Sequence, residues 1–410
     1  VTIVTRAVRY ALLILAVLGL AAPLAATGEE AMPAKSGGSV LAIETGRGKD
    51  FLVRVDRQSF RPVSRRLALG GHAYAWSLSP DRRRLAVGVD GAHGVRIIDL
   101  RRMKRLRTIR TWSTEVRTLA WVTPRRILGW EPAGLFLLDP LARKPLPSPE
   151  VTGDVLRSRR AGDRLLLLTA PVLELGPARL VLVGADGEVR TIVLDPIKAG
   201  TRYDIVGETH VPALVLAAAD RAFVVGSAGE PVADVDLQRL AVTYHEPTEE
   251  RSLLARFRNW LEPAAQAKMP FLGGVRNGLW LGDGRLAVWG EDTVRVGAEA
   301  AETTPAGLRV IDTNDWTLRT IDAKAWDAAY AGGTLLASYR RDGLTAFDLD
   351  GTRRYHLFDG EALGVVATFE SRAFVAFDHK PMHVLDAITG RVVGTRTSYP
   401  RLLDASFSGW

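Results

Sequence analysis

Short apolar runs separated by turn residues recur from residue 39 to the end of the chain. In Ser77–Leu100 (SLSPDRRRLAVGVDGAHGVRIIDL), three such runs are broken by Pro-Asp, by Asp-Gly and by a loop that contains glycine. Runs of this length, bounded by Gly, Pro, Asn or Asp, predict β-strands joined by tight turns. The second run of a unit is often apolar throughout, which favours a strand covered on both faces.

The same succession of about four runs appears in seven units. Asp-Gly pairs at 90–91, 186–187, 283–284, 342–343 and 350–351 suit turns that need a positive φ. The third run repeatedly ends in an apolar residue followed by Asp, whose carboxylate can accept backbone N–H bonds from the next turn. The units are Ser77–Leu100, Val116–Pro140, Asp154–Leu194, Pro212–Leu237, Asn277–Ile321, Asp327–Phe358 and Leu363–Thr395.

Two sequence patterns carry a resemblance to known repeat families. SPDRRRLAV (79–87) resembles the S-P-D-G-x-x-L-A-V signature of WD40-type and TolB-type blades. LDAITGRVV (385–393) and IDTNDWTLRTI (311–321) resemble the I-D-x-x-T-G-K-V-V element of YVTN-type blades. No unit ends in Trp-Asp, so the chain is most similar to degenerate bacterial members of this superfamily. The resemblance implies an all-β, circular β-propeller.

A propeller must close its ring. Residues 39–69 supply three strands and residues 401–409 supply one, so the two ends of the chain are expected to form one composite blade. With the seven internal units this predicts eight blades over residues 39–410, and seven blades is the alternative if one unit is an insertion.

Two segments depart from the repeat. In HEPTEERSLLARFRNWLEPAAQAKMPFLG (245–273), apolar residues at helical spacing predict an amphipathic helix inserted at about residues 247–270, beginning near Thr248. Its apolar face either packs on the propeller or docks a partner, and Arg256 and Trp260 are its candidate contact residues. Residues 291–307 are acidic and Ala-rich, and predict a long hairpin loop.

The N-terminal segment predicts export. Arg6 and Arg9 precede the apolar run ALLILAVLGLAAPLAA (11–26), which ends in small residues. This is the pattern of a signal peptide over residues 1–26, followed by a polar linker over residues 27–38. An uncleaved anchor is the alternative. Either way we expect a secreted or cell-envelope protein, with no membrane span beyond this segment, and nucleic acid is not an expected partner.

The charge is uneven along the chain. Residues 57–126 hold 17 Arg or Lys and 4 Asp or Glu, whereas the remainder has a net charge of −5. Such asymmetry can mark an anionic partner, and the alternative is a solvated rim of outer strands. The densest stretch supplies the candidate contact residues for an unknown acidic protein or anionic envelope polymer: Arg101, Arg102, Lys104, Arg105 and Arg107.

No motif for catalysis stands out. The chain has no Cys and no G-x-S-x-G, H-E-x-x-H, P-loop or EF-hand pattern. His379 and His383 flank Pro381, which favours a β-turn over a metal site. We therefore predict no catalytic residue, metal or cofactor, and favour a non-catalytic binding or scaffold module. The alternative is an enzyme or a ligand- or metal-binding propeller that uses the central channel, lactonase-like or quinoprotein-like.

Overall fold

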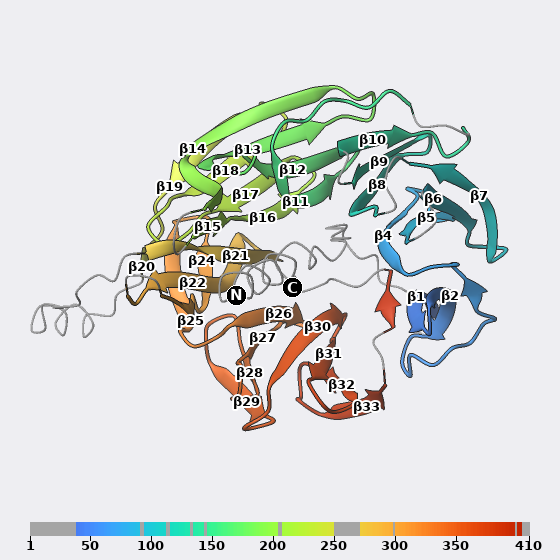
Figure 1. Cartoon of the computed structure of the whole chain (residues 1–410). Coiled ribbons are helices and arrows are strands. Elements are labelled where there is room, and N and C mark those ends of the chain that lie inside the picture. Colours follow the sequence, from blue (N-terminus) through green and yellow to red (C-terminus); the bar gives the residue numbers. More distant parts are fainter. Residues whose placement is uncertain are drawn as a thin grey trace, which may run out of the picture.

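A computed structural model describes residues 38–90, 94–111, 115–131, 134–142, 146–203, 207–249, 271–297, 300–397 and 400–403. These residues form β-sheets that are antiparallel except for two parallel pairings, and the sheets follow one another in a ring (Figure 1). This is a circular, all-β propeller, as the repeat predicts. Within the described ranges no helix is long and apolar enough to cross a membrane.

Six sheets stand as separate blades. The first is ordered β3-β2-β1-β34 and contains β1 (Ser39–Gly46), β2 (Lys49–Asp56), β3 (Leu67–Ala68) and β34 (Arg401–Leu402). The second contains β4 (Ala73–Leu78), β5 (Arg84–Val89), β6 (Gly94–Asp99) and β7 (Lys104–Arg110). The third contains β8 (Thr118–Thr123), β9 (Arg126–Glu131) and β10 (Gly134–Leu138).

The other three separate blades have four strands each. One contains β16 (Ala213–Ala218), β17 (Arg221–Val225), β18 (Val232–Asp236) and β19 (Ala241–His245). The next contains β26 (Asp327–Ala331), β27 (Thr334–Ser338), β28 (Leu344–Phe347) and β29 (Arg353–Leu357). The last contains β30 (Leu363–Phe369), β31 (Arg372–Phe377), β32 (Met382–Asp386) and β33 (Val392–Arg396).

The remaining strands form one continuous sheet of eleven strands. On the N-terminal side it contains β11 (Asp154–Ala161), β12 (Arg164–Ala170), β13 (Leu175–Val183), β14 (Val189–Arg202) and β15 (Glu208–Val211). On the C-terminal side it contains β20 (Thr248–Glu249), β21 (Phe271–Gly282), β22 (Arg285–Arg295), β23 (Ala301–Pro305), β24 (Leu308–Asp312) and β25 (Thr317–Asp322).

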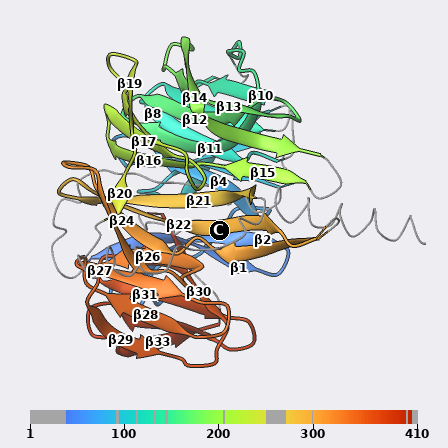
Figure 2. The same ribbon diagram turned by 90° about the vertical axis from the view of Figure 1, so that its left-hand side faces the viewer.

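This arrangement corrects the predicted blade count. Neither eight nor seven separate blades is present in the described part of the chain, where six separate blades are joined by the eleven-stranded sheet. The reason is that β14 has 14 residues, and its last part pairs with β15. In turn, β15 pairs in parallel with Gly273–Val275 of β21, so backbone pairing continues across two repeat units. Figure 2 shows β15 between β14 and β21.

The predicted inserted helix is also corrected, because the described residues contain no helix. Thr248 and Glu249, expected to begin it, instead form β20 and pair in parallel with Thr317 and Leu318. Residues 250–270, including Arg256 and Trp260, lie outside the described residues. In the other irregular segment, Glu291–Arg295 of β22 pairs with β23, so the hairpin there continues as paired strands.

The ends of the chain meet in the first blade. Ala42 and Ile43 of β1 pair with Leu402 and Arg401 of β34, which is the composite closure expected from the sequence.

Between blades, the core is apolar and closely packed. Trp121, Phe136 and Ile97 are fully buried between the second and third blades. A Cβ on Gly129 would lie 2.1 Å from the Phe136 ring, so only glycine leaves room for that ring.

Candidate functional site

The basic stretch found in the sequence lies at one edge of the second blade. Arg84 pairs with Asp99, and Asp99 pairs with Lys104, so the β4–β5 and β6–β7 turns lie at the same end of the blade. The amide of Leu100 donates to the Arg83 carbonyl at 2.9 Å and joins the two turns. We call the end of the ring that carries these turns face I.

Exposed cations gather on face I. In an antiparallel blade the β8–β9 turn of the third blade lies at this same end, and the first strands β4 and β8 of the two blades are in contact. The exposed cations of these turns and of the first two residues of β7 define the basic sector: Arg82, Arg83, Arg101, Arg102, Lys104, Arg105 and Arg125. Four of the five candidate residues on the basic stretch belong to it.

The carboxylates near the basic sector are engaged in turns. Asp99 accepts a hydrogen bond from the Arg102 amide at 2.9 Å, and this bond lowers the pKa of Asp99. Asp81 accepts bonds from the Ser79 hydroxyl and from the Arg83 amide, which lower its pKa. Asp139 accepts the Leu141 amide at 2.8 Å. These three carboxylates stand among seven cations, so the sector keeps a net positive charge.

Arg107, the fifth candidate on this stretch, has a different place. Its side chain is partly buried, and its guanidinium donates to the backbone carbonyl of Leu141, in the loop that follows β10. A second donation reaches the Ala142 carbonyl at 3.5 Å. Arg107 therefore links the second and third blades, and we assign it to the structure of the sector rather than to partner contact.

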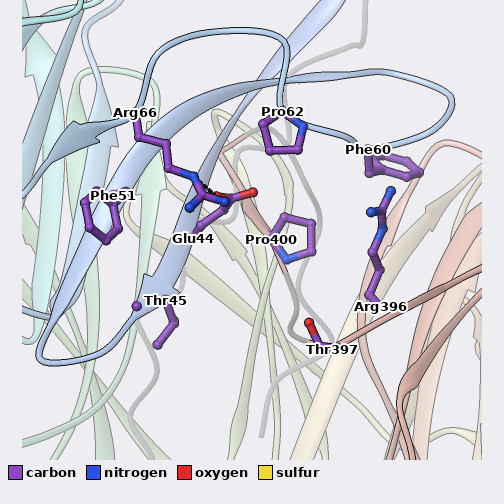
Figure 3. A pocket seen from close by; sticks show the side chains of 10 residues that line it. Glu44, Thr45, Phe51, Phe60, Pro62, Arg66, Arg396, Thr397 and Pro400 are labelled. Atoms are coloured by element: carbon purple, nitrogen blue, oxygen red, sulfur yellow. Dashed lines mark ion pairs between the residues drawn. The ribbon is translucent and has the colours of Figure 1, made fainter.

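A pocket of about 230 Å³ lies between the first and last blades (Figure 3). Its apolar walls include Phe51, Phe60 and Pro400, and Arg396 lines it from β33. Arg66 Nε lies 2.9 Å from Glu44 Oε2, so these two charges compensate each other. Burial lowers the pKa of Arg396, as does the Arg61 cation, while Glu44 opposes them. The pocket joins residues about 350 positions apart, which no local pattern predicts.

A buried ionisable cluster lies where β14, β15 and β21 meet. His210 is 2% exposed, and its Nε2 lies 3.1 Å from Glu208 Oε1. Arg202 of β14 pairs with Glu208, and Arg276 of β21 pairs with Asp292. Burial lowers the pKa of His210. Because its charges are paired between strands, the cluster holds the continuous sheet together, and the sequence patterns did not point to it.

The described part of the chain does not bring potential metal ligands together. No group of three His, Asp or Glu side chains there is close enough to hold a metal ion. His383 packs edge-on against Phe358 and Phe377, and burial lowers its pKa. His245 stacks on Trp316 with ring centroids 3.6 Å apart. These histidines serve as packing side chains.

The comparisons with known proteins define the fold. No family model matches the chain, and no curated protein sequence matches it. Among solved structures, dihydro-heme d1 dehydrogenase NirN is similar with a TM-score of 0.55 and 15% identity, covering 91% of this chain and 76% of NirN. BamB from Moraxella catarrhalis has a TM-score of 0.45 and 10% identity, covering 83% and 93% of the two chains. The chain is thus a β-propeller, and at these identities the similarity extends to fold alone.

Proposed function

We propose that this protein is an exported, non-catalytic binding propeller that uses the basic sector to hold an acidic protein partner. The observation that carries the proposal is the convergence of exposed arginine side chains from the turns of two neighbouring blades onto face I. Exposed cations that outnumber nearby carboxylates create a positive potential, which attracts and orients an acidic partner.

Edge protection accounts for only part of this charge. β7 is the outermost strand of its blade, and charged side chains on an edge strand prevent pairing with another chain. Lys104 and Arg105 serve that purpose. Arg83 and Arg101, however, lie in turns, where no strand edge needs protection. Their charge therefore points to recognition of a partner.

The rigid support of the sector also favours binding. Arg107 ties β7 to the neighbouring blade, and the turns are held by the Asp81 and Asp99 carboxylates. Fixed turns lose little conformational entropy when a partner binds. Arginine is suited to this role because its planar guanidinium can hold a carboxylate with two parallel hydrogen bonds.

A binding assay with polyanions tests the proposal. The full chain is passed over immobilised poly-L-glutamate, polygalacturonate and neutral dextran by biolayer interferometry, from 50 to 300 mM NaCl. We expect binding to poly-L-glutamate that weakens by about tenfold or more over this range, because exposed charges are screened by salt. No binding to poly-L-glutamate at 50 mM NaCl would overturn the proposal, and binding to polygalacturonate alone would replace the acidic protein by an anionic polysaccharide.

Export is tested separately. Cleavage after Ala26 gives a mature protein that begins at Thr27. We expect intact-mass measurement on protein from the envelope and medium of its own host to give this mass. Recovery of the uncleaved chain from the cytoplasm would contradict export.

A further inference from the structure

Two arginines lie on β11, the inner edge strand of its blade. Arg157 and Arg159 are two residues apart on a strand, so their side chains project from the same side. Arg157 Nη2 donates to Asn277 Oδ1 of β21 at 3.5 Å. β16 lies between β11 and β21 and contacts both, so this bond passes on the axial side of β16. The Arg157 guanidinium therefore lies near the axis.

Neither arginine has a carboxylate partner in the part of the chain that the structure describes. Arg157 Nη1 donates to the Leu156 carbonyl at 3.0 Å, and Arg159 Nη1 donates to the Ser158 carbonyl at 2.9 Å. Together with the Asn277 contact, these bonds use a minority of the five N–H donors that each guanidinium carries. The other donors are available to an oxyanion.

The placement of this pair is unfavourable without a counter-charge. Both side chains are half-buried, and desolvation lowers the pKa of each to about 10. The charge on Arg157 lowers the pKa of Arg159 further. Both are still cations at neutral pH, so two like charges share one poorly solvated region. Such an arrangement costs free energy unless an anion completes it.

The strand that carries the two arginines is anchored to its neighbour. Ser158, whose side chain projects from the opposite side of β11, is 5% exposed, and its Oγ lies 3.1 Å from Thr118 Oγ1 of the neighbouring blade. This bond holds β11 against β8, and Asn277 contacts the Arg157 guanidinium. The strand that carries both cations is thus in place before any ligand binds, which reduces the entropic cost of binding.

We propose that the ring centre is a binding site for a small molecule that carries two oxyanion groups, carboxylate or phosphate, held by Arg157 and Arg159. We infer two oxyanion groups from the spacing of Arg157 and Arg159 on β11. The side chains of residues i and i+2 of a strand leave the backbone about 7 Å apart, so each guanidinium can hold one group. Guanidinium groups match carboxylate and phosphate oxygens equally in geometry. This site is separate from the basic sector and does not depend on the proposed function.

The test uses citrate and pyrophosphate as probes on the full chain. Isothermal titration calorimetry and thermal unfolding are run at constant ionic strength on wild type, Arg157→Gln and Arg159→Gln. We expect one or both probes to bind wild type and raise its Tm, and each variant to lose affinity at least tenfold. Arg105→Gln, which removes an exposed cation of the basic sector, is the control and should bind as wild type does.

The ligand-free proteins give a second readout. Because Arg159 has no carboxylate partner among the described residues, we expect Arg159→Gln to unfold at a Tm equal to or above that of wild type. Arg159→Lys keeps the charge without the planar fork and should show an intermediate affinity. Failure of both probes to bind wild type would overturn the site, as would an equal loss of affinity in Arg105→Gln.

Discussion

Arg401 and Arg159 lie on edge strands of two sheets of the same ring, and they differ in what surrounds their charge. Arg401, on β34, pairs with the carboxylate of Asp50, which is 1% exposed. Arg159, on β11, donates to a backbone carbonyl and has no carboxylate partner among the described residues. The charge of Arg401 is explained by Asp50 within the chain. The charge of Arg159 has no such explanation among the described residues, which suggests an anionic ligand as its partner.

Several hydrogen-bond donors surround the Asp50 carboxylate at the closure. Its carboxylate also accepts the Ala73 amide at 2.8 Å and lies 3.1 Å from His72 Nδ1. Arg401 donates to the Ala73 carbonyl at 2.7 Å, and its guanidinium lies 5.4 Å from the centre of the Trp76 ring. The cluster therefore joins both ends of the chain to the second blade.

The largest effect is expected from breaking this pair. Arg401→Met leaves the Asp50 carboxylate buried without its cation, which costs about 3–5 kcal/mol of unfolding free energy. Urea unfolding followed by circular dichroism measures the loss. The double variant Asp50→Asn with Arg401→Met should recover part of it, because the uncompensated charge is gone. A loss below about 1 kcal/mol would show that the pair does not hold the closure.

A smaller effect is expected at Asp327, a half-buried carboxylate that has hydrogen-bond donors but no cationic partner among the described residues. It accepts Trp289 Nε1 at 2.7 Å and the Ala328 amide at 2.8 Å. Burial is the dominant cause that raises the pKa of Asp327 to about 7, against 3.8 for the unfolded chain. The folded state thus holds its proton more tightly, and this stabilisation is complete below about pH 4 and lost as the pH rises through 7.

Asp327→Asn removes that dependence and keeps an oxygen that can accept both bonds. Relative to the variant, wild type should lose up to about 4 kcal/mol of unfolding free energy between pH 4 and pH 8. Urea unfolding of both proteins at the two pH values checks this. If the unfolding free energy of both proteins changed by the same amount between the two pH values, the pKa of Asp327 would not be raised by folding.

The smallest effect on stability is expected in the basic sector, where charges are exposed. Lys104→Thr with Arg105→Thr should change the unfolding free energy by no more than about 0.5 kcal/mol. The same change removes charge from the β7 edge, so we expect more light scattering on storage at high concentration. A large loss of stability would show that these side chains are structural, as Arg107 is.

Sequence patterns predicted contacts correctly where the residues in contact are close together in the sequence. The apolar-Asp endings predicted turn contacts, and Asp386 does accept the Thr389 amide and hydroxyl, both at 3.0 Å. Residues 39–69 were correctly joined to the strand at Arg401–Leu402 because a ring must close. The continuous sheet escaped prediction because β15 and β21 are about 60 residues apart, and strand patterns do not specify the partner of an exposed edge.

The candidate site residues were also predictable only where their role does not depend on distant parts of the chain. Arg101, Arg102, Lys104 and Arg105 are exposed on the strand and turn where the sequence placed its basic stretch. Arg107 differs because its partner is a backbone carbonyl of another blade. Arg157 and Arg159 stand in DVLRSRRA (154–161), where alternate arginines read as the solvated face of an ordinary strand. Only the position of β11 at the axis distinguishes them.

One measurement tests the central claim that the basic sector is a recognition surface. The affinity for poly-L-glutamate at 50 mM NaCl is compared between two variants of equal net charge. The first carries Gln at Arg101, Arg102, Lys104 and Arg105. The second carries Gln at four arginines outside the sector, which are Arg190, Arg239, Arg353 and Arg391. The account predicts a loss of at least about tenfold in the first and less than about twofold in the second. Equal losses in the two variants would contradict it, because net charge and not the basic sector would then determine binding.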